Sequence, residues 1–169
     1  MIVLRKIICS LLWVIPLAAL LASCGEEAPR LISGEPTPAF TLERLCGGSL
    51  HFPDDLRGDV VAIRFWADWC PFCEGEMRDL EPVYRRYRDQ GLVILAINVR
   101  QDRERAAAFI EKIDIDYEVL LDPGGETTRN YGVIGLPTTF LLGRDGRLHA
   151  KIIGESTPAV FTEIVRDLL

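Results

Sequence analysis

The chain has 169 residues, of which 49% are hydrophobic and 26% are charged, and its formal net charge is −6. This length and composition suit one globular domain with an ordinary core and argue against a disordered chain. The acidic balance argues against nucleic acid as a partner, because phosphate binding requires clustered Lys and Arg. Five cysteines are too few for a disulfide-rich scaffold of this length, so their positions carry the information: Cys9, Cys24, Cys46, Cys70 and Cys73.

The first 23 residues have the pattern of an export signal. Arg5 and Lys6 precede an uncharged apolar stretch over 7–22, which is shorter than the roughly 20 residues that a helix needs to span a bilayer. The stretch ends in Leu21-Ala22-Ser23-Cys24, which resembles the bacterial lipobox. The sequence therefore predicts a signal peptide over 1–23 and lipidation of Cys24, with an uncleaved signal anchor as the alternative.

The residues after Cys24 have the composition of a linker. Residues 25–38 contain three Pro, two Gly and three Glu, which favours a flexible tether over a helix or strand. We therefore expect a tether over 24–38 and a single folded domain over 39–169.

The first half of the domain begins with two short strand-like segments, 39–42 and 49–52, around a turn at Cys46-Gly47-Gly48. Val60–Trp66 is almost continuously apolar, which is typical of a central strand covered on both faces. A helix is predicted from about Pro71 to Gln90, because apolar residues recur there at steps of three and four.

The second half continues the alternation of strands and helices. The predicted elements are a parallel strand at 92–99, a helix at 103–113, a strand at 117–121, a helix at 127–131, a hairpin with strands at 138–142 and 148–153, and a last helix at 157–168. This order predicts an α/β fold, with a mixed central sheet and helices on both faces.

Cys70 and Cys73 lie between the central strand and the long helix. A helix N-terminus carries partial positive charge and free N–H groups, which favour a thiolate over a thiol. Cys70 is therefore the predicted nucleophile and Cys73 the predicted resolving thiol. The alternatives are a structural disulfide and half of a zinc site, but His51, His149 and Cys46 are not paired as a second half would require.

The segments FWADWCPFC and GLPTTFLL, together with the lead-in PAFTLERLCGGSLHFPDDLRGDVVAIRFWADWC, carry a resemblance. They resemble the thioredoxin superfamily and, within it, the TlpA/ResA branch of membrane-tethered thiol–disulfide reductases of the bacterial envelope. The resemblance covers roughly residues 36–169. It implies a thioredoxin fold with an N-terminal β-hairpin and a helix–strand insertion, and a cis Leu136–Pro137 peptide that faces the cysteines.

The resemblance also assigns roles to neighbours of the cysteines. Glu76 matches a glutamate that lies near the dithiol in ResA-type proteins, where a carboxylate can relay the proton of the second cysteine; the alternative is a first-turn acid favoured by the helix dipole. The residues expected to form the recognition surface are Trp69, Pro71, Phe72 and Leu136. Asp68 and Glu74 are expected to be solvated surface acids, and Cys46 an idle thiol, with a third redox centre as its alternative.

Arg64 departs from the family pattern, because many thioredoxins have Asp there and this branch often has Asn. An unpaired guanidinium in a covered strand would cost several kcal/mol. We therefore predict an ion pair between Arg64 and Glu76, with a nitrogen–oxygen separation within about 4 Å, that tunes the pKa of the cysteines. The alternative is that Arg64 leans to solvent and Glu76 faces water.

The predicted function is a membrane-tethered, extracytoplasmic protein-disulfide reductase that needs no metal or cofactor besides the Cys70–Cys73 pair. The resemblance implies disulfide-containing clients, apocytochrome c among them, a membrane thiol donor of the CcdA/DsbD type, and a lipid-anchored monomer in the cell envelope or periplasm. The alternatives are an oxidase or isomerase of the same fold and an SCO-like copper chaperone, which needs a CxxxC spacing. A peroxidase is disfavoured because peroxiredoxins place a Thr where this chain has Ala67.

Overall fold

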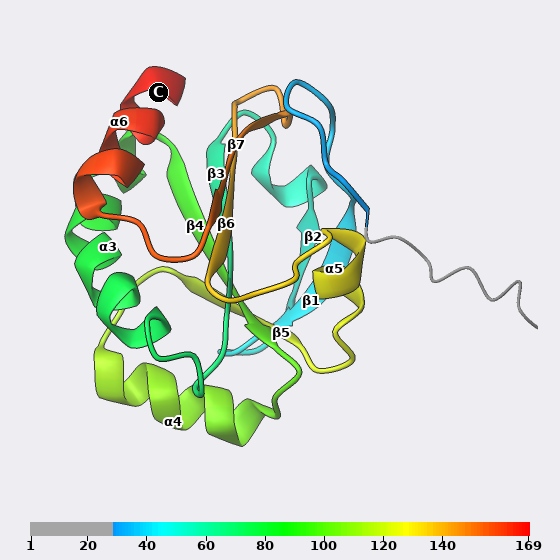
Figure 1. The fold of residues 1–169 in the computed structure, drawn as a ribbon, viewed down its shortest axis with the longest axis vertical. Helices are drawn as coiled ribbons and strands as arrows, with labels where there is room; N and C mark the ends of the chain where they lie inside the picture. Colours follow the sequence, from blue (N-terminus) through cyan, green and yellow to red (C-terminus); the bar gives the residue numbers. More distant parts are fainter. Residues whose placement is uncertain (1–28) are drawn as a thin grey trace, which may run out of the picture.

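A seven-stranded mixed sheet runs through the protein and carries helices on both faces (Figure 1). The computed structural model describes residues 29–169, so the predicted signal peptide over 1–23 and the lipidation site at Cys24 lie outside the described residues. The strands are β1 (Phe40–Arg44), β2 (Ser49–Phe52), β3 (Val60–Trp66), β4 (Leu92–Val99), β5 (Glu118–Asp122), β6 (Thr138–Leu142) and β7 (Leu148–Ile153). Their order across the sheet is β2-β1-β5-β4-β3-β6-β7. The predicted N-terminal hairpin and mixed sheet are confirmed.

Strand β3 lies in the interior of the sheet, where it pairs in parallel with β4 and antiparallel with β6. All seven of its residues are buried, which explains its nearly continuous apolar sequence. Side chains alternate across a strand. Ala62 and Trp66 therefore enter the core on one face of the sheet, and Ile63 and Phe65 the core on the other. Arg64 follows the same alternation and lies on the face of Ala62 and Trp66.

Three helices cover the face of the sheet to which Trp66 belongs: α3 (Cys73–Tyr87), α4 (Arg103–Ile113) and α6 (Pro158–Leu168). The first of these was predicted from about Pro71, and the structure places its start two residues later. Phe72 occupies its N-cap position, so α3 begins at Cys73, and after Tyr87 the chain tightens into a 3₁₀ turn over Arg88–Gln90.

The short helix α5 (Glu126–Asn130) lies on the opposite face, where Tyr131 packs with Phe65 and Phe140. A second 3₁₀ turn, Asp54–Leu56, lies between β2 and β3. The start of α5 is fixed by the buried carboxylate of Asp122 at the end of β5. This carboxylate accepts hydrogen bonds from the Thr128 amide and hydroxyl, at 2.8 and 2.6 Å.

The N-terminal residues that the structure describes are held against the domain. Gly34 N donates to Leu148 O at 2.7 Å, Leu148 N donates to Glu35 O at 2.9 Å, and Pro36 forms an antiparallel bridge with Arg147. Leu31 packs against one of the two cores. Residues 31–38 therefore belong to the folded unit, and the predicted boundary at residue 39 is too late.

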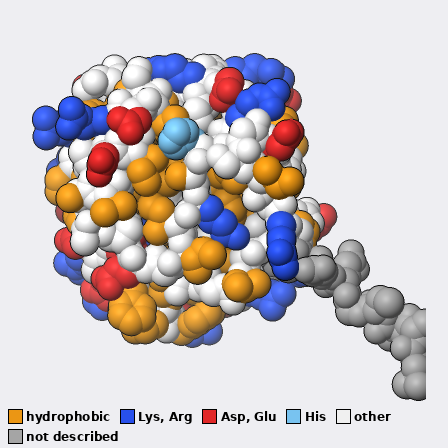
Figure 2. All heavy atoms as spheres, turned by 45° about the horizontal axis from the view of Figure 1, so that its top comes forward, with side chains coloured by type: hydrophobic (Ala, Val, Ile, Leu, Met, Phe, Trp, Pro, Cys, Tyr) orange, Lys and Arg blue, Asp and Glu red, His pale blue; other side chains and the backbone are white. Residues whose placement is uncertain are grey.

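The described surface mixes charges of both signs. On the face drawn in Figure 2, acidic and basic side chains are interspersed with apolar ones. Within residues 29–169, no helix combines the length and the apolar character needed to cross a bilayer.

Candidate active site

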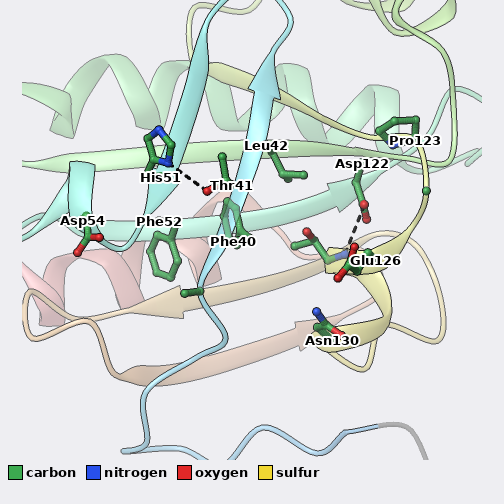
Figure 3. Close-up of a pocket in the computed structure, with 13 residues that line it drawn as sticks. Phe40, Thr41, Leu42, His51, Phe52, Asp54, Asp122, Pro123, Glu126 and Asn130 are labelled. Atoms are coloured by element: carbon green, nitrogen blue, oxygen red, sulfur yellow. Dashed lines mark hydrogen bonds between the residues drawn. The ribbon is translucent and has the colours of Figure 1, made fainter.

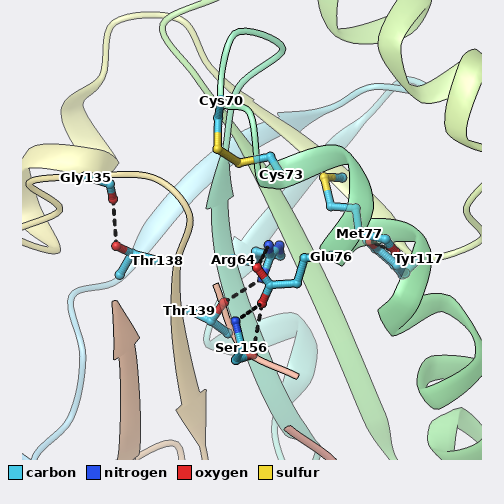
Figure 4. Close-up of polar contacts among 10 residues, drawn as sticks. All are labelled: Arg64, Cys70, Cys73, Glu76, Met77, Tyr117, Gly135, Thr138, Thr139 and Ser156. Carbon is cyan, nitrogen blue, oxygen red and sulfur yellow. Dashed lines mark hydrogen bonds and ion pairs between the residues drawn. A yellow bond between two sulfur atoms is a disulfide. The ribbon is translucent and has the colours of Figure 1, made fainter. Parts of the chain in front are cut away.

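Cys70 and Cys73 form a disulfide where β3 passes into α3 (Figure 4). One tight turn precedes the disulfide, where Cys70 N donates to Ala67 O, and a second joins the two cysteines, where Cys73 N donates to Cys70 O, both at 3.2 Å. Cys73 is the first residue of α3, so the pair lies at the positive end of the helix dipole. In this disulfide form Cys70 is 2% exposed and Cys73 is fully buried.

Exposed aromatic side chains flank the buried disulfide. Trp69 is 65% exposed and Phe72 is 53% exposed, and Pro71 between the cysteines is also exposed. Large apolar side chains left in water beside a reactive group are characteristic of a binding surface. Their role in recognition stays a prediction.

The Leu136–Pro137 peptide bond is cis, as the resemblance implies. Leu136 packs against the core cluster that contains both cysteines. On the other side of the proline, the Thr138 hydroxyl donates to the Gly135 carbonyl at 2.7 Å and closes the loop that precedes β6 (Figure 4).

The predicted ion pair between Arg64 and Glu76 is confirmed. Arg64 Nη2 donates to Glu76 Oε2 at 2.7 Å, and each side chain is 1% exposed. Arg64 Nη1 also donates to the Thr139 hydroxyl at 3.1 Å. Glu76 Oε1 accepts from the backbone N–H and the hydroxyl of Ser156, at 3.2 and 3.0 Å. The pair therefore joins β3, α3, β6 and the loop before α6 (Figure 4).

A buried tyrosine lies on the same side of the sheet. Tyr117 donates its hydroxyl to the Met77 carbonyl at 2.9 Å, one residue beyond Glu76 on α3. Burial raises the pKa of Tyr117 well above its usual range. The phenol is therefore neutral at physiological pH and serves as a hydrogen-bond donor.

Gln101 organises the loop before Trp69, and the sequence analysis did not single it out. Its Oε1 accepts from Asp68 N at 3.0 Å and from Asn98 Nδ2 at 2.9 Å, and its Nε2 donates to the Asp68 carboxylate. Arg105 also pairs with Asp68 at 3.3 Å. Asp68 is thus a half-buried structural acid, which corrects the expectation that it is solvated.

Two other features lie apart from the disulfide. Cys46 is a free, exposed cysteine in the turn between β1 and β2. A cavity of about 630 Å³ lies between that hairpin and α5, with Thr41, His51 and Glu126 among its lining residues (Figure 3). None of the residues that line it belongs to the Cys70–Cys73 segment or to the loop around Pro137.

Comparison with known proteins agrees with this geometry. Residues 33–151 match the model of the AhpC/TSA family. The chain belongs to this family. It is 33% identical to the thiol–disulfide oxidoreductase ResA of Bacillus thuringiensis over 135 residues, which cover 80% of this chain and 78% of the relative. ResA of Geobacillus thermodenitrificans is 34% identical over 136 residues, with the same coverage.

Solved structures show the same fold. A Chlorobium tepidum protein described as a thiol:disulfide interchange protein DsbE superposes with a TM-score of 0.76 at 29% identity, covering 83% of this chain and all of that one. StoA of Bacillus subtilis superposes with a TM-score of 0.65 at 25% identity, covering 75% of this chain and 95% of that one. With its Cys70–Cys73 pair, the chain is a thiol–disulfide oxidoreductase of the ResA/DsbE type with a thioredoxin-like fold.

The buried ion pair makes a prediction about stability. Arg64→Met leaves the Glu76 carboxylate buried without a counter-charge, and Glu76→Leu does the same to Arg64, so each should lower the free energy of unfolding by about 3–5 kcal/mol. The double variant should lose much less than the sum of the two. Urea unfolding of the disulfide form measures these values.

The exposed pair Arg57–Asp54, whose side chains are 75% and 70% exposed, provides the control. Replacing either partner should change stability by no more than about 1 kcal/mol. Additive losses at Arg64 and Glu76 would show that the two charges do not compensate each other.

Proposed function

We propose that the protein is a membrane-tethered, extracytoplasmic disulfide reductase that acts on protein clients. The observation that carries this proposal is the Cys70–Cys73 disulfide at the N-terminus of α3, beside the exposed Trp69 and Phe72. The reaction class agrees with the name of the ResA relatives.

In the proposed reaction, the reduced protein starts with Cys70 as a thiolate, stabilised by the helix N-terminus. Its sulfur attacks one sulfur of the client disulfide, the client S–S bond breaks, and one client cysteine leaves as a thiolate that takes up a proton. Cys73 then loses its proton and attacks Cys70 Sγ, which releases the second client thiolate. Two electrons pass to the client, and the Cys70–Cys73 disulfide remains. These steps need no cofactor besides the cysteine pair.

Cys73 needs a base for the second step, and Glu76 is the acidic side chain one turn further along α3. Both of its oxygens already accept hydrogen bonds, Oε2 from Arg64 and Oε1 from Ser156. Oε1 accepts two hydrogen bonds and Oε2 accepts one, so the acceptor position left for a direct proton relay by Glu76 is on Oε2. We propose that Glu76 also acts on the thiols through its charge, in opposition to that of Arg64.

The proposed setting follows the resemblance to the TlpA/ResA branch. The clients would be apocytochromes c with oxidised haem-binding cysteines, and a membrane protein of the CcdA/DsbD type would return electrons to the pair. Lipid on Cys24 would hold the monomer on the outer side of the cytoplasmic membrane or elsewhere in the envelope.

The reduction potential of the Cys70–Cys73 pair tests the direction of the reaction. A reductase should have a value near that of thioredoxin, about −270 mV. Equilibration with glutathione or dithiothreitol buffers, followed by alkylation of free thiols, measures it. A value near about −120 mV, as in strong oxidants, would instead identify a disulfide oxidase.

The order of attack can be tested with single serine variants. Cys70→Ser should abolish reduction of clients, because no nucleophile remains. Cys73→Ser should accumulate mixed disulfides, since attack survives and resolution does not. Non-reducing gels of protein incubated with an oxidised client detect the adduct. If only the Cys70 variant traps the client, the roles of the two cysteines are reversed.

Cys46→Ser should leave the reductase activity within about twofold of the parent, because an unused thiol takes no part in the reaction.

The opposed charges of Arg64 and Glu76 predict opposite shifts at the thiols. Arg64→Gln removes a positive charge and should raise the Cys70 pKa by about one unit, while Glu76→Gln should lower it by a similar amount. Thiolate absorbance of the reduced protein during a pH titration reads this pKa. Arg166→Gln, an exposed change in the last turn of α6, should leave it unchanged, and shifts of the same sign at Arg64 and Glu76 would refute the proposed roles.

Membrane attachment depends on Cys24 in this proposal. Cys24→Ala should release the protein into the soluble envelope fraction or leave the signal uncleaved, because the lipid acceptor is lost. Fractionation and gel mobility of the full-length protein in a bacterial host give the result. A variant that fractionates and migrates like the parent would rule out the lipid anchor.

A further inference from the structure

A groove of about 350 Å³ lies beside the disulfide, at the edge of the sheet where the parallel strands β3 and β4 end. Its apolar lining comes from Trp69, which precedes Cys70, and from Val133, Ile134 and Leu136 in the loop that leads to Pro137. Ile134 is 82% exposed. Since Trp69 adjoins Cys70 in the chain, a client that presents a disulfide to Cys70 has this apolar surface within reach of its neighbouring residues.

Two arginines also line the groove. Arg100 follows β4 and Arg129 belongs to α5. None of the described residues that line the groove is acidic. Arg129 Nη1 donates to the Gly124 carbonyl at 2.9 Å, and no carboxylate of residues 29–169 forms a salt bridge with either arginine. Within residues 29–169, the two positive charges of the groove thus have no salt-bridge partner, on a protein whose net charge is negative.

The backbone and its neighbours determine where the Arg100 side chain lies. Arg100 has φ 55°, a left-handed conformation that is uncommon for residues other than glycine. Its side chain crosses directly over Gly125, where an added Cβ would lie 2.9 Å from Arg100 Cγ and 3.2 Å from Cδ. The absence of a side chain at residue 125 therefore leaves room for the Arg100 stem beside α5.

An apolar surface beside two unneutralised guanidinium groups is complementary to a peptide segment with apolar residues and a carboxylate. Guanidinium groups bind carboxylates with directed, charge-assisted hydrogen bonds, which adds specificity to the attraction. Charge complementarity of this kind discriminates between partners and accelerates their encounter.

We propose that Arg100 and Arg129 are specificity-determining residues that select client segments carrying Asp or Glu within a few residues of the attacked cysteine. This inference rests on the proposed function, since it concerns the clients of the Cys70–Cys73 pair. It adds a chemical criterion for those clients: an acidic side chain next to the disulfide favours reaction.

The test uses two synthetic peptides, each with one internal disulfide, that differ only by Glu or Gln next to the first cysteine. The rate constant of exchange is measured by acid quench and chromatography, with reduced protein and oxidised peptide and also in the reverse direction. The Glu peptide should react about three- to tenfold faster at low salt, as two partly solvated ion pairs allow. This advantage should disappear at about 1 M salt, where the Debye length falls to about 3 Å.

The variants assign the preference to the two arginines. The double variant Arg100→Gln/Arg129→Gln should react with both peptides at about equal rates, whereas Arg166→Gln on α6 should keep the preference of the parent. Equal rates in the parent protein, or an undiminished preference in the double variant, would overturn the proposal.

The reductase activity and the role of the two arginines can be refuted separately. A reduction potential in the oxidase range would overturn the proposed reductase while the preference for the Glu peptide stands. Equal rates would overturn the role of the arginines while the reductase stands. Absence of exchange with both peptides in both directions would overturn both.

Discussion

The structure depends on the buried ion pair between Arg64 and Glu76. Both charged groups are closed off from water, so each must be compensated by the other inside the protein. Arg64 lies on the central strand, and Glu76 lies on the helix that begins with Cys73. Thr139 and Ser156 add hydrogen bonds from β6 and from the loop before α6, and within the described residues the buried Arg64 Nε alone of the pair's polar atoms has no hydrogen-bond partner. Any shift of α3 along the sheet would break charge-assisted hydrogen bonds, so the same contacts that satisfy the two charges also fix the position of the cysteine pair.

The charges near the cysteines and the charges in the groove lie on different residues. Arg64 and Glu76 carry opposite charges within one ion pair, so their fields at the cysteines largely oppose each other, and the N-terminus of α3 remains as the main favourable influence on a thiolate. The unneutralised charges lie elsewhere, on Arg100 and Arg129 in the groove outside the disulfide. In the roles proposed above, nucleophile activation and client selection depend on different residues, so substitutions can address them separately.

Sequence patterns were sufficient where the physical signal is local. The strands Val60–Trp66 and Leu92–Val99 were predicted with their observed bounds, because continuous apolar runs between polar turns leave little ambiguity. The Arg64–Glu76 pair was predictable because a charge in a covered strand must find a partner. The packing of residues 31–38 was not, since it uses backbone hydrogen bonds that composition does not encode. The position of Arg100 depends on a left-handed backbone and on contact with Gly125, and neither has a signature in the chain.

The docking of the N-terminal residues limits how far the domain can move from an anchor. The Pro29 carbonyl lies against Gly132, at the start of the loop that leads to Ile134 and Pro137. If Cys24 carries lipid as proposed, only the five-residue step from Cys24 to Pro29 separates the anchor from the docked chain, a covalent reach of at most about 18 Å. The side of the domain that bears this loop then stays next to the bilayer. Clients would be met by a two-dimensional search along the membrane surface, and a protein emerging from the membrane would reach the groove more readily than one diffusing freely.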